Sequence, residues 1–580
     1  MIKQRSLTGD TFHPNPLLDR IYRGRGVTSM GEIDYSMSGM LPPEMKDINK
    51  ACDLLEQAIL NNHNILIIGD YDCDGATASS IAVEGLTLLG SKNVSFMVPD
   101  RMKLGYGLAP PIVHLAAKRN PDLIVTVDNG ISAIDGALAV KKLVSSRTGK
   151  EGDVKLLITD HHLAPEILPE ADAIVNPNQK DCPFPSKCIA GCGVMFYVLI
   201  ALKKQMKEKG VFEQLNIPEP DLRELLDLLA LGTVADVVAL DKNNRIFVYQ
   251  GLQRIKKGLV RPGIRHLLEI GKGDINSIKS MDFGFSIGPK INSAGRLDDM
   301  TFGITCLLEK DFDEARKKAL ALDELNKQRK EIQSEMLESA SDMLKKANFG
   351  IDSSALTICV YDKDFHEGVI GLVASRLKED YSRPVIVFTD TETNKDQIKG
   401  SGRSIPEIHL RDIIEEVSTL TNSVAKFGGH AMAAGLNIKK ADFEKFKACF
   451  EDCVSKKIST INEFIETDGE LLPEQMNVET CRILDNAGPW GQMFPEPVFN
   501  GKFVVLFSKP LKSDHLKLKI SPVGYIGMSI DAIFFNYFDG RNSDVAVGDI
   551  VNIAYSPSIN KYNGNETFQV MIRKLVVDKT

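Results

Sequence analysis

Acidic and histidine side chains gather where predicted strands end in the first third of the chain. Four short apolar runs are each followed closely by such residues: 65–68 by Asp70, Asp72 and Asp74, 94–98 by Asp100, 123–127 by Asp128, and 155–159 by Asp160, His161 and His162. In an open parallel sheet, ligands bind at the carboxyl ends of the strands, so we expect these side chains to converge on one edge. Like charges within about 4–6 Å raise each other's pKa, so the cluster requires protons or a cation.

Oxygen ligands combined with imidazoles favour Mg²⁺ or Mn²⁺ over a thiolate-selecting zinc site. Asp72 and Asp74 leave a strand end on a loop, from which both can turn toward one ion. Asp236 is a further candidate, because a carboxylate within the apolar run 232–239 is costly unless it is paired or coordinated. The sequence therefore predicts a divalent-metal site.

Each motif has another interpretation when it is taken alone. The segment 70–75 also resembles a calcium loop, although the glutamate of an EF-hand is missing at its expected place. Asp-Asn-Gly at 128–130 is often only a turn, and adjacent histidines can be a surface coincidence. Their repetition at successive strand ends favours the metal site.

A metal pair on this edge would suit phosphoester hydrolysis, because two ions about 3.5–4 Å apart activate water and stabilise the attacking and leaving oxygens. Arg101 follows the second strand and could add a cationic arm. Tyr106, between two glycines, could stack on a base or be an ordinary turn residue.

The composition is that of a globular protein, with 43% hydrophobic and 26% charged residues, which excludes a disordered or collagen-like chain. The formal net charge of −8 provides no basic field, so a site for a polyanion must be local or depend on metal ions. Cys182, Cys188 and Cys192 cluster without CxxC spacing and are expected to be ordinary thiols. We find no signal region and no apolar run of membrane length, and expect a cytoplasmic protein.

Apolar runs alternate with helix-like stretches from 64 to 177, which predicts a parallel sheet covered on both faces. Residues 306–349 contain neither Gly nor Pro, and the strong helix formers at 314–347 predict a helix of about 50–60 Å that separates domains. A second α/β unit follows, with strands at 355–361 and 384–389 around a helix. After about residue 467, alternating runs predict a small barrel or sandwich.

In their order, GDYDCDG, PDR, GYG, VDNG, TDHH and GTVADV resemble the DHH phosphoesterase superfamily. KINSAGR, HEGVIGLVASRL, GSGRS and KFGGHAMAAG extend the resemblance into a DHHA1-type domain, and the whole layout is similar to the single-strand-specific DNA exonucleases of that superfamily. The resemblance implies an α/β fold with a parallel-sheet DHH domain, a long connecting helix, a smaller α/β DHHA1 domain and a C-terminal OB-like β-barrel. The expected parts are an N-terminal segment at 1–50, the DHH catalytic domain at 51–305, the long connecting helix at 306–350, the DHHA1 domain at 351–460 and the OB-like DNA-binding domain at 461–580.

The implied activity is 5′–3′ exonucleolytic hydrolysis of single-stranded DNA to mononucleotides with Mn²⁺ or Mg²⁺, in DNA repair and recombination. A helicase and a single-strand-binding protein are implied partners. One rival is a superfamily enzyme for short RNA, cyclic dinucleotides or pyrophosphate. The other is a non-catalytic DNA-binding scaffold, which intact acids at every motif disfavour.

The resemblance also assigns residues. The metal positions are matched by Asp70, Asp72, Asp74, Asp128, His161 and Asp236. Asp160 would orient its neighbours, and His162 would act at the scissile phosphate as an electrostatic or proton-transfer partner. Pyrophosphatase-like members carry a histidine four residues before the first paired acid, where this chain has Ile68, so the second metal site would have one ligand fewer.

For the strand itself, the resemblance implies a pocket for a terminal 5′-phosphate formed by Arg101, Ser401 and Arg403, and DNA contacts from Tyr106, Arg296, Gly429 and His430. The alternatives are a Gly-rich turn with a solvated arginine at 400–404 and a surface role for Arg296. Lys517 and Lys519 alternate with apolar residues and could bind the strand or protect a sheet edge.

Overall fold

The computed structural model describes residues 2–100, 107–347, 349, 355–391, 394–458, 464–511, 515–525, 527–537, 545–562 and 564–578. These residues form two compact units. The first comprises Met1–Gly295, Asp299–Leu322 and Phe464–Thr580, and the second comprises Arg296–Asp298 and Asp323–Glu463. The C-terminal β region therefore packs with the N-terminal half, although the second unit lies between them in sequence.

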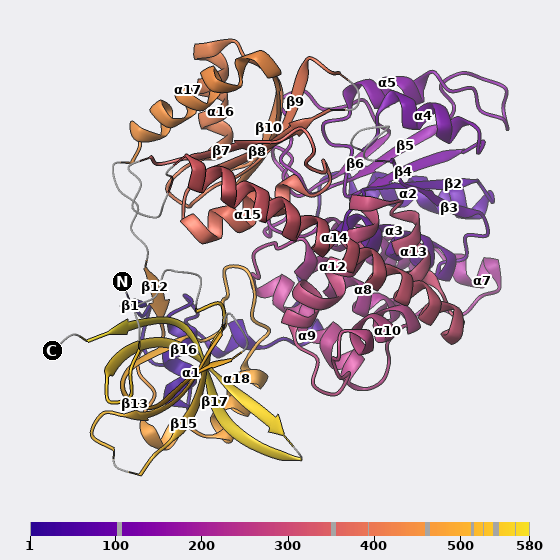
Figure 1. Cartoon of the computed structure of the whole chain (residues 1–580). Coiled ribbons are helices and arrows are strands. Elements are labelled where there is room, and N and C mark those ends of the chain that lie inside the picture. The colour runs from indigo at the N-terminus through magenta and orange to yellow at the C-terminus, as the bar shows by residue number, and fades with distance from the viewer. Residues whose placement is uncertain are drawn as a thin grey trace. The chain divides into compact units, whose positions relative to one another are not determined.

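The first unit contains a five-stranded parallel sheet (Figure 1). In spatial order its strands are β3 (Val94–Met97), β2 (Ile65–Gly69), β4 (Leu123–Val127), β5 (Lys155–Thr159) and β6 (Ala173–Val175). Every residue of β2 and β4 is buried, as expected for strands covered on both faces. The predicted parallel sheet is confirmed, and all five carboxyl ends point to the same edge.

The first unit also contains helices before, between and after these strands. They are α1 (Pro16–Arg23), α2 (Ile48–Leu60), α3 (Cys73–Leu88), α4 (Pro110–Ala117), α5 (Ile134–Lys141), α6 (Gly191–Glu208), α7 (Val211–Leu215), α8 (Leu226–Ala235), α9 (Lys242–Lys256), α10 (Pro262–Ile270), α11 (Ser280–Asp282), α12 (Gly288–Leu297) and α13 (Thr301–Leu308), with short turns η1 (Met30–Ile33), η2 (Met37–Gly39), η3 (Leu222–Leu225) and the π-helix η4 (Phe283–Ile287). None of the helices within the described residues is long and apolar enough to cross a membrane.

The long helix is α14 (Phe312–Lys346), 35 residues that begin in the first unit and end in the second. Its length is about 52 Å at about 1.5 Å per residue. It starts later than the Gly- and Pro-free stretch, because the Asp311 side chain accepts the Glu314 N–H at 2.9 Å, as helix-starting residues do. Residues 306–308 belong instead to α13.

The second unit is a mixed sheet with helices. Its strand order is β10 (Val424–Gly429), β11 (Ala433–Lys439), β9 (Gln397–Arg403), β8 (Val385–Asp390) and β7 (Ile358–Tyr361), and its helices are α15 (Ile370–Tyr381), α16 (Leu410–Thr421), η5 (Lys440–Asp442) and α17 (Phe443–Ser455). The glycine-rich segment 400–403 lies inside β9 and pairs with both neighbours. The Gly-rich turn considered for this segment is therefore wrong, since Gly400 makes room for Phe388 of the neighbouring strand β8 and Gly402 for Leu410 of α16.

The C-terminal region is a closed barrel, which decides between the barrel and the sandwich. Its order is β13 (Phe499–Leu511), β14 (His515–Pro522), β15 (Ile530–Phe534), β17 (Asn565–Val577) and β16 (Ile550–Tyr562), preceded by β12 (Ile465–Thr467), η6 (Pro473–Gln475) and α18 (Val478–Ala487). Leu516, Leu518 and Ile520 of β14 are buried. Lys517 and Lys519 face outward, where each lies 3.6 Å from Asp531.

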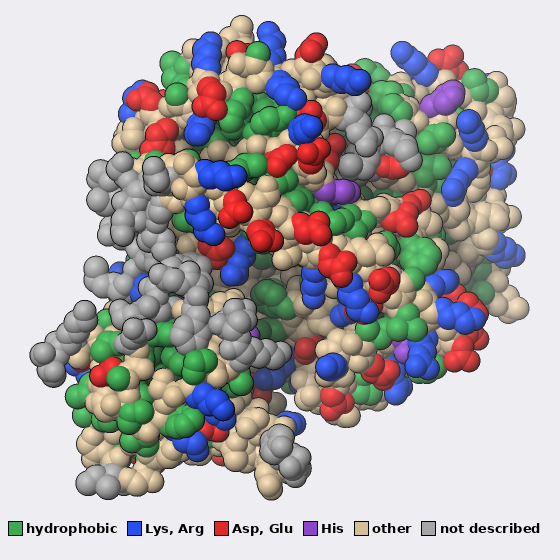
Figure 2. Space-filling model, viewed as in Figure 1, with side chains coloured by type: hydrophobic (Ala, Val, Ile, Leu, Met, Phe, Trp, Pro, Cys, Tyr) green, Lys and Arg blue, Asp and Glu red, His purple; other side chains and the backbone are tan. Residues whose placement is uncertain are grey.

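The N-terminal segment joins this barrel to the sheet domain. Strand β1 (Ile2–Gln4) pairs with β12, and Arg25 binds both carboxylate oxygens of Asp468 at 2.7 and 3.1 Å. Both side chains are 1% exposed. On the face drawn in Figure 2, acidic and basic side chains are interspersed over the surface, in keeping with the nearly balanced composition.

Candidate metal centre

The predicted acids reach the sheet edge from both strands and helices. Asp70, Asp128 and Asp160 follow β2, β4 and β5, while Asp72 is the N-cap of α3 and Asp236 the C-cap of α8. Asp128 has a φ of 61°, a left-handed conformation that aspartate tolerates better than most residues. The parallel topology thus gathers residues from five elements at one place.

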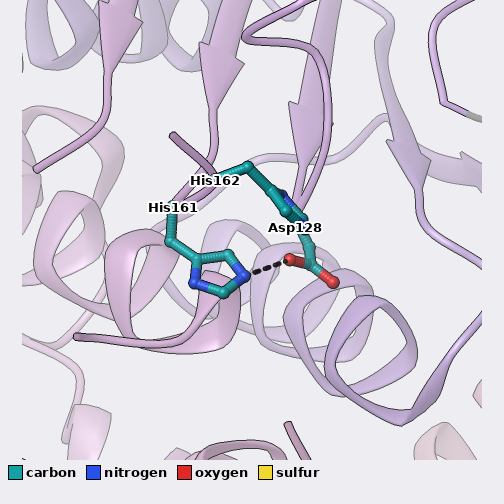
Figure 3. Close-up of side chains that lie close together, drawn as sticks. All are labelled: Asp128, His161 and His162. Carbon is teal, nitrogen blue, oxygen red and sulfur yellow. Dashed lines mark ion pairs between the residues drawn. The ribbon is translucent and has the colours of Figure 1, made fainter. Parts of the chain in front are cut away.

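Three overlapping groups have ligand atoms that all lie within 4.8 Å of one another. They are Asp74 with His161 and Asp236, Asp70 with Asp72 and Asp128, and Asp128 with His161 and His162. Figure 3 shows the last group, with His161 Nε2 directed at the Asp128 carboxylate at 3.1 Å. Because the first two groups share no residue, the site offers ligands for two ions.

Helix α6 orients Asp74. The N-cap of α6 is Ala190, which has no side chain able to cap the helix. The Asp74 carboxylate replaces it, accepting the N–H groups of Gly191 at 2.6 Å and Cys192 at 3.0 Å. A Cβ atom at Gly191 would lie 2.6 Å from Asp128 Oδ1, so only glycine allows this approach. Each Asp74 oxygen keeps a second lone pair for an ion.

Asp160 organises the histidine pair. Its Oδ1 accepts the backbone N–H of His161 at 2.7 Å and contacts His162 Nδ1 at 2.7 Å, and its Oδ2 accepts the Ile131 N–H at 2.9 Å. Burial lowers the pKa of His162, but the hydrogen bond and charge of Asp160 outweigh it and raise that pKa to about 9. Burial acts to raise the pKa of Asp160, yet the His162 contact holds it below the usual value. The two therefore form a charged pair at neutral pH.

The other acids are in the opposite situation. Burial, and then the charges of neighbouring carboxylates, raise the pKa values of Asp70, Asp128 and Asp236 well above the usual range. Burial also lowers the pKa of His161, which keeps its ring neutral as a metal ligand requires. The buried His161 Nε2 makes no hydrogen bond of acceptable geometry. Carboxylates that resist ionisation beside an unsatisfied imidazole nitrogen fit a divalent cation.

Sequence reasoning missed the residues that support the histidines. The Asn178 amide donates to the His161 carbonyl at 2.5 Å, and the Asn176 amide donates to the His162 carbonyl at 3.0 Å. Both follow β6, so the strand-end rule that identified the acids would have found them. Gly191 carried no comparable signal, because its role depends on the packing of α6 against α3.

The predicted phosphate residues of the second unit lie together. Arg403 Nη1 donates to Ser401 Oγ at 3.3 Å, and a Cβ atom at Gly371 would lie 3.0 Å from Ser401 Oγ and 3.1 Å from Arg403 Nη2. The first turn of α15 therefore borders both side chains. Arg101 and Tyr106 lie outside the described residues.

The remaining predicted DNA contacts also belong to the second unit. Arg296 Nη1 donates to the Gly368 carbonyl at 3.0 Å, which fastens it to the segment before α15. Gly429 pairs with Ala434 in the sheet, and the His430 N–H donates to the Ala433 carbonyl at 2.8 Å. These contacts define where the residues lie and leave their roles toward DNA as predictions.

Three protein-family models match the chain. They are the DHH family N-terminal domain at residues 64–233, the DHHA1 domain at 353–456 and the RecJ OB domain at 467–574. Together they span the parallel sheet, the mixed sheet and the closed barrel.

Full-length relatives give the same result. The chain is 44% identical to the single-stranded-DNA-specific exonuclease RecJ of Salmonella typhimurium over 561 residues, covering 96% of this chain and 95% of that protein, and 43% identical to the same exonuclease of Escherichia coli with equal coverage. A crystal structure of RecJ with Mn²⁺ from Thermus thermophilus matches all of this chain and 80% of that one, at 27% identity and a TM-score of 0.79. The corresponding Mg²⁺ structure matches with a TM-score of 0.74.

Proposed function

This chain belongs to the RecJ family of single-stranded-DNA-specific exonucleases, and we propose that it hydrolyses single-stranded DNA from the 5′ end with Mn²⁺ or Mg²⁺, releasing mononucleotides. The observation that carries the proposal is the convergence of Asp74, His161 and Asp236 beside Asp70, Asp72 and Asp128. Neither the smaller substrates of the superfamily nor a scaffold role accounts for both this cluster and the barrel.

The acid cluster and His161 hold the metal ions in this proposal. Bound divalent ions lower the pKa of water and stabilise the charge that develops on the phosphate oxygens. The protein contributes the ligand placement: Asp74 is fixed by the α6 N-terminus, and His161 is held through its backbone by Asp160 and Asn178. With these groups in place, the scissile phosphate meets a site that needs little rearrangement.

His162 is assigned the transfer of a proton to the leaving group. With a pKa of about 9, its ring is cationic at neutral pH and held by Asp160. A cationic imidazole attracts the scissile phosphate, and its Nε2 proton can pass to the leaving 3′ oxygen as that oxygen gains charge. Asp160 acts through His162, by fixing the ring and stabilising its charge.

Ser401 and Arg403 are assigned binding of the terminal 5′-phosphate, together with Arg101, as the resemblance implies. The guanidinium can donate two parallel bonds to a phosphate, and the first turn of α15 adds the positive end of a helix beside Gly371. Tyr106, Arg296, Gly429 and His430 are proposed to contact the DNA strand.

The barrel is assigned binding of the longer strand, as OB-folds bind oligonucleotides. Phe507 and Phe535 are about half exposed and can stack on bases. The proposal also includes a helicase and a single-strand-binding protein as partners, a cytoplasmic location, and a role in DNA repair and recombination. It divides the chain into five parts, with boundaries after residues 50, 305, 350 and 460.

A digest of end-labelled oligonucleotides tests the proposal. With Mn²⁺, a 5′ label should be released at once as a mononucleotide, while a 3′ label stays on progressively shorter strands, and chelation of the metal should stop both. Faster turnover of a dinucleotide than of a long strand would instead support a small-substrate enzyme. A metal-independent digest or early release of the 3′ label would contradict the proposal.

A further inference from the structure

Arg261 contacts both helices that carry acids to the metal centre, although it lies at the N-cap of α10. Its guanidinium donates from Nε and Nη2 to the two carboxylate oxygens of Asp227 in α8, at 3.0 and 2.9 Å. Its Nη1 donates to Glu84 of α3 at 2.8 Å. The Arg261 side chain is 5% exposed, and Asp227 is 2% exposed. One buried residue thus fastens α8 to α3.

The two helices run antiparallel, and their metal-binding acids lie at the ends remote from Arg261. Asp74 is in the first turn of α3, about 15 Å along that helix from Glu84 at about 1.5 Å per residue. Asp236 is the C-cap of α8, about 14 Å along that helix from Asp227. The carboxylates of Asp74 and Asp236 belong to one ligand group with His161. The helices are therefore joined at one end by Arg261 and at the other by the ligand group.

Between these ends the helices are in close contact. A Cβ atom at Gly232 of α8 would lie 2.2 Å from Thr77 Oγ1 and 3.0 Å from Asp74 Oδ1. Close packing limits sliding of the helices along their axes, and a metal site requires any remaining axial freedom to be small. A slide of one residue moves a side chain by about 1.5 Å, whereas metal-ligand distances tolerate about 0.2 Å.

We propose that Arg261 is a positioning residue for the metal centre: its paired bonds to Asp227 and its bond to Glu84 fix the register of α8 against α3 and so bring Asp236 and Asp74 to one ion. This inference rests on the metal centre of the proposed function. Burial acts to raise the pKa of Glu84, but the charge of Arg261 and the bonds from Lys310 and Arg261 outweigh it and lower that pKa. Glu84 is therefore ionised at neutral pH.

The test is the dissociation constant for Mn²⁺ of the full chain without DNA, measured by titration calorimetry. Arg261→Lys keeps the charge but loses the paired geometry, because an ammonium cannot form the two-bond fork. We expect a dissociation constant about 10-fold higher than that of the wild type, the size of effect seen when groups supporting metal ligands are changed. Glu84→Gln removes one charge from the network and should give about a threefold increase.

A matched control is available at Arg25, which pairs with both oxygens of Asp468 and is as deeply buried, but joins the N-terminal segment to the barrel region. Arg25→Lys should lower the melting temperature as Arg261→Lys does, while leaving Mn²⁺ affinity unchanged. An equal loss of affinity in both variants would contradict the proposal, since the effect would then reflect general destabilisation.

Other outcomes separate this inference from the proposed function. Mn²⁺ affinity of Arg261→Lys within about twofold of the wild type would overturn the role of Arg261 alone. If Arg261→Lys does not fold, Glu84→Gln decides, and wild-type affinity in that variant overturns the role. Failure of the wild type to bind Mn²⁺ would contradict the metal centre itself.

Discussion

The sheet edge of the first unit and strand β9 of the second unit, both proposed to bind phosphate groups, differ in the source of their positive charge. Asp128 is 2% exposed among other carboxylates whose pKa values are raised by burial and mutual repulsion. Arg403 is half-buried and already bonded to Ser401 and the Gly402 carbonyl. At the acid cluster, positive charge for a phosphate would come from bound cations. Arg403 is itself positively charged. Metal should therefore control the first region and leave the second unchanged.

The largest effect is expected from removing a ligand of the acid cluster. Asp128 belongs to two of the ligand groups, so Asp128→Asn should lower Mn²⁺-dependent degradation of single-stranded DNA by about 10³-fold or more, because charge stabilisation by the ions is lost. Binding of single-stranded DNA, measured by fluorescence anisotropy, should change little.

Asp122 provides the control at the other end of the same strand. It accepts the Asn64 N–H at 2.9 Å and lies 3.3 Å from Arg147, remote from the cluster. Asp122→Asn should retain activity within a few fold. Comparable losses in both variants would show that the acids of this strand matter for folding rather than for metal.

A smaller effect is expected in the second unit. Arg403→Lys should reduce the preference for a 5′-phosphate over a 5′-hydroxyl end by about 10-fold, because lysine cannot form the paired bonds of a guanidinium. Initial rates on the two kinds of end, at several Mn²⁺ concentrations, measure this. The Mn²⁺ dependence should stay that of the wild type.

Arg376→Lys is the matched variant, because Arg376 lies on α15 at 3.2 Å from Asp380 and outside the proposed pocket. It should leave the end preference unchanged. A shift in the Mn²⁺ dependence of Arg403→Lys would contradict the prediction that metal acts on the sheet edge and not on strand β9.

The pH dependence of stability should distinguish the buried carboxylates from the arginine region further. Asp70, Asp128 and Asp236 have raised pKa values in the folded protein, so the stability they contribute is present below the unfolded value near 4 and is lost as pH rises through the raised values. Mn²⁺ binds the deprotonated acids. Its addition should therefore raise the melting temperature by about 5 °C more at about pH 8 than at about pH 5.5. The Asp128→Asn variant should show a smaller difference, and an equal rise at both pH values in the wild type would argue against a carboxylate site.

The smallest effect is expected on the barrel. Lys519 is 52% exposed and lies 3.6 Å from Asp531, which offsets part of its charge. Lys519→Ala should weaken binding of a long single strand about twofold at low salt and reduce the salt dependence slightly, while a short oligonucleotide should be degraded at the wild-type rate. Equal effects on long and short strands would place Lys519 in another role.

Much of the sheet and its acids could be predicted because both depend on local patterns. The apolar runs at 123–127, 155–159 and 173–175 coincide with β4, β5 and β6, and the acids follow from the strand-end rule. The strand position of Ser401 and Arg403 could not be predicted, since glycines at 400 and 402 are typical of turns and are explained only by packing against Phe388 and Leu410. Capping of α6 by Asp74 was equally hidden, because the partners are more than a hundred residues apart.

The most direct test of the account is the anomalous scattering of Mn²⁺ in crystals of the wild-type protein. We expect density for ions between Asp74, His161 and Asp236 and between Asp70, Asp72 and Asp128, and loss of the ion of the second group in Asp128→Asn. Ordered acids with no anomalous density between them at saturating Mn²⁺ would contradict the central claim that this buried cluster is a metal centre.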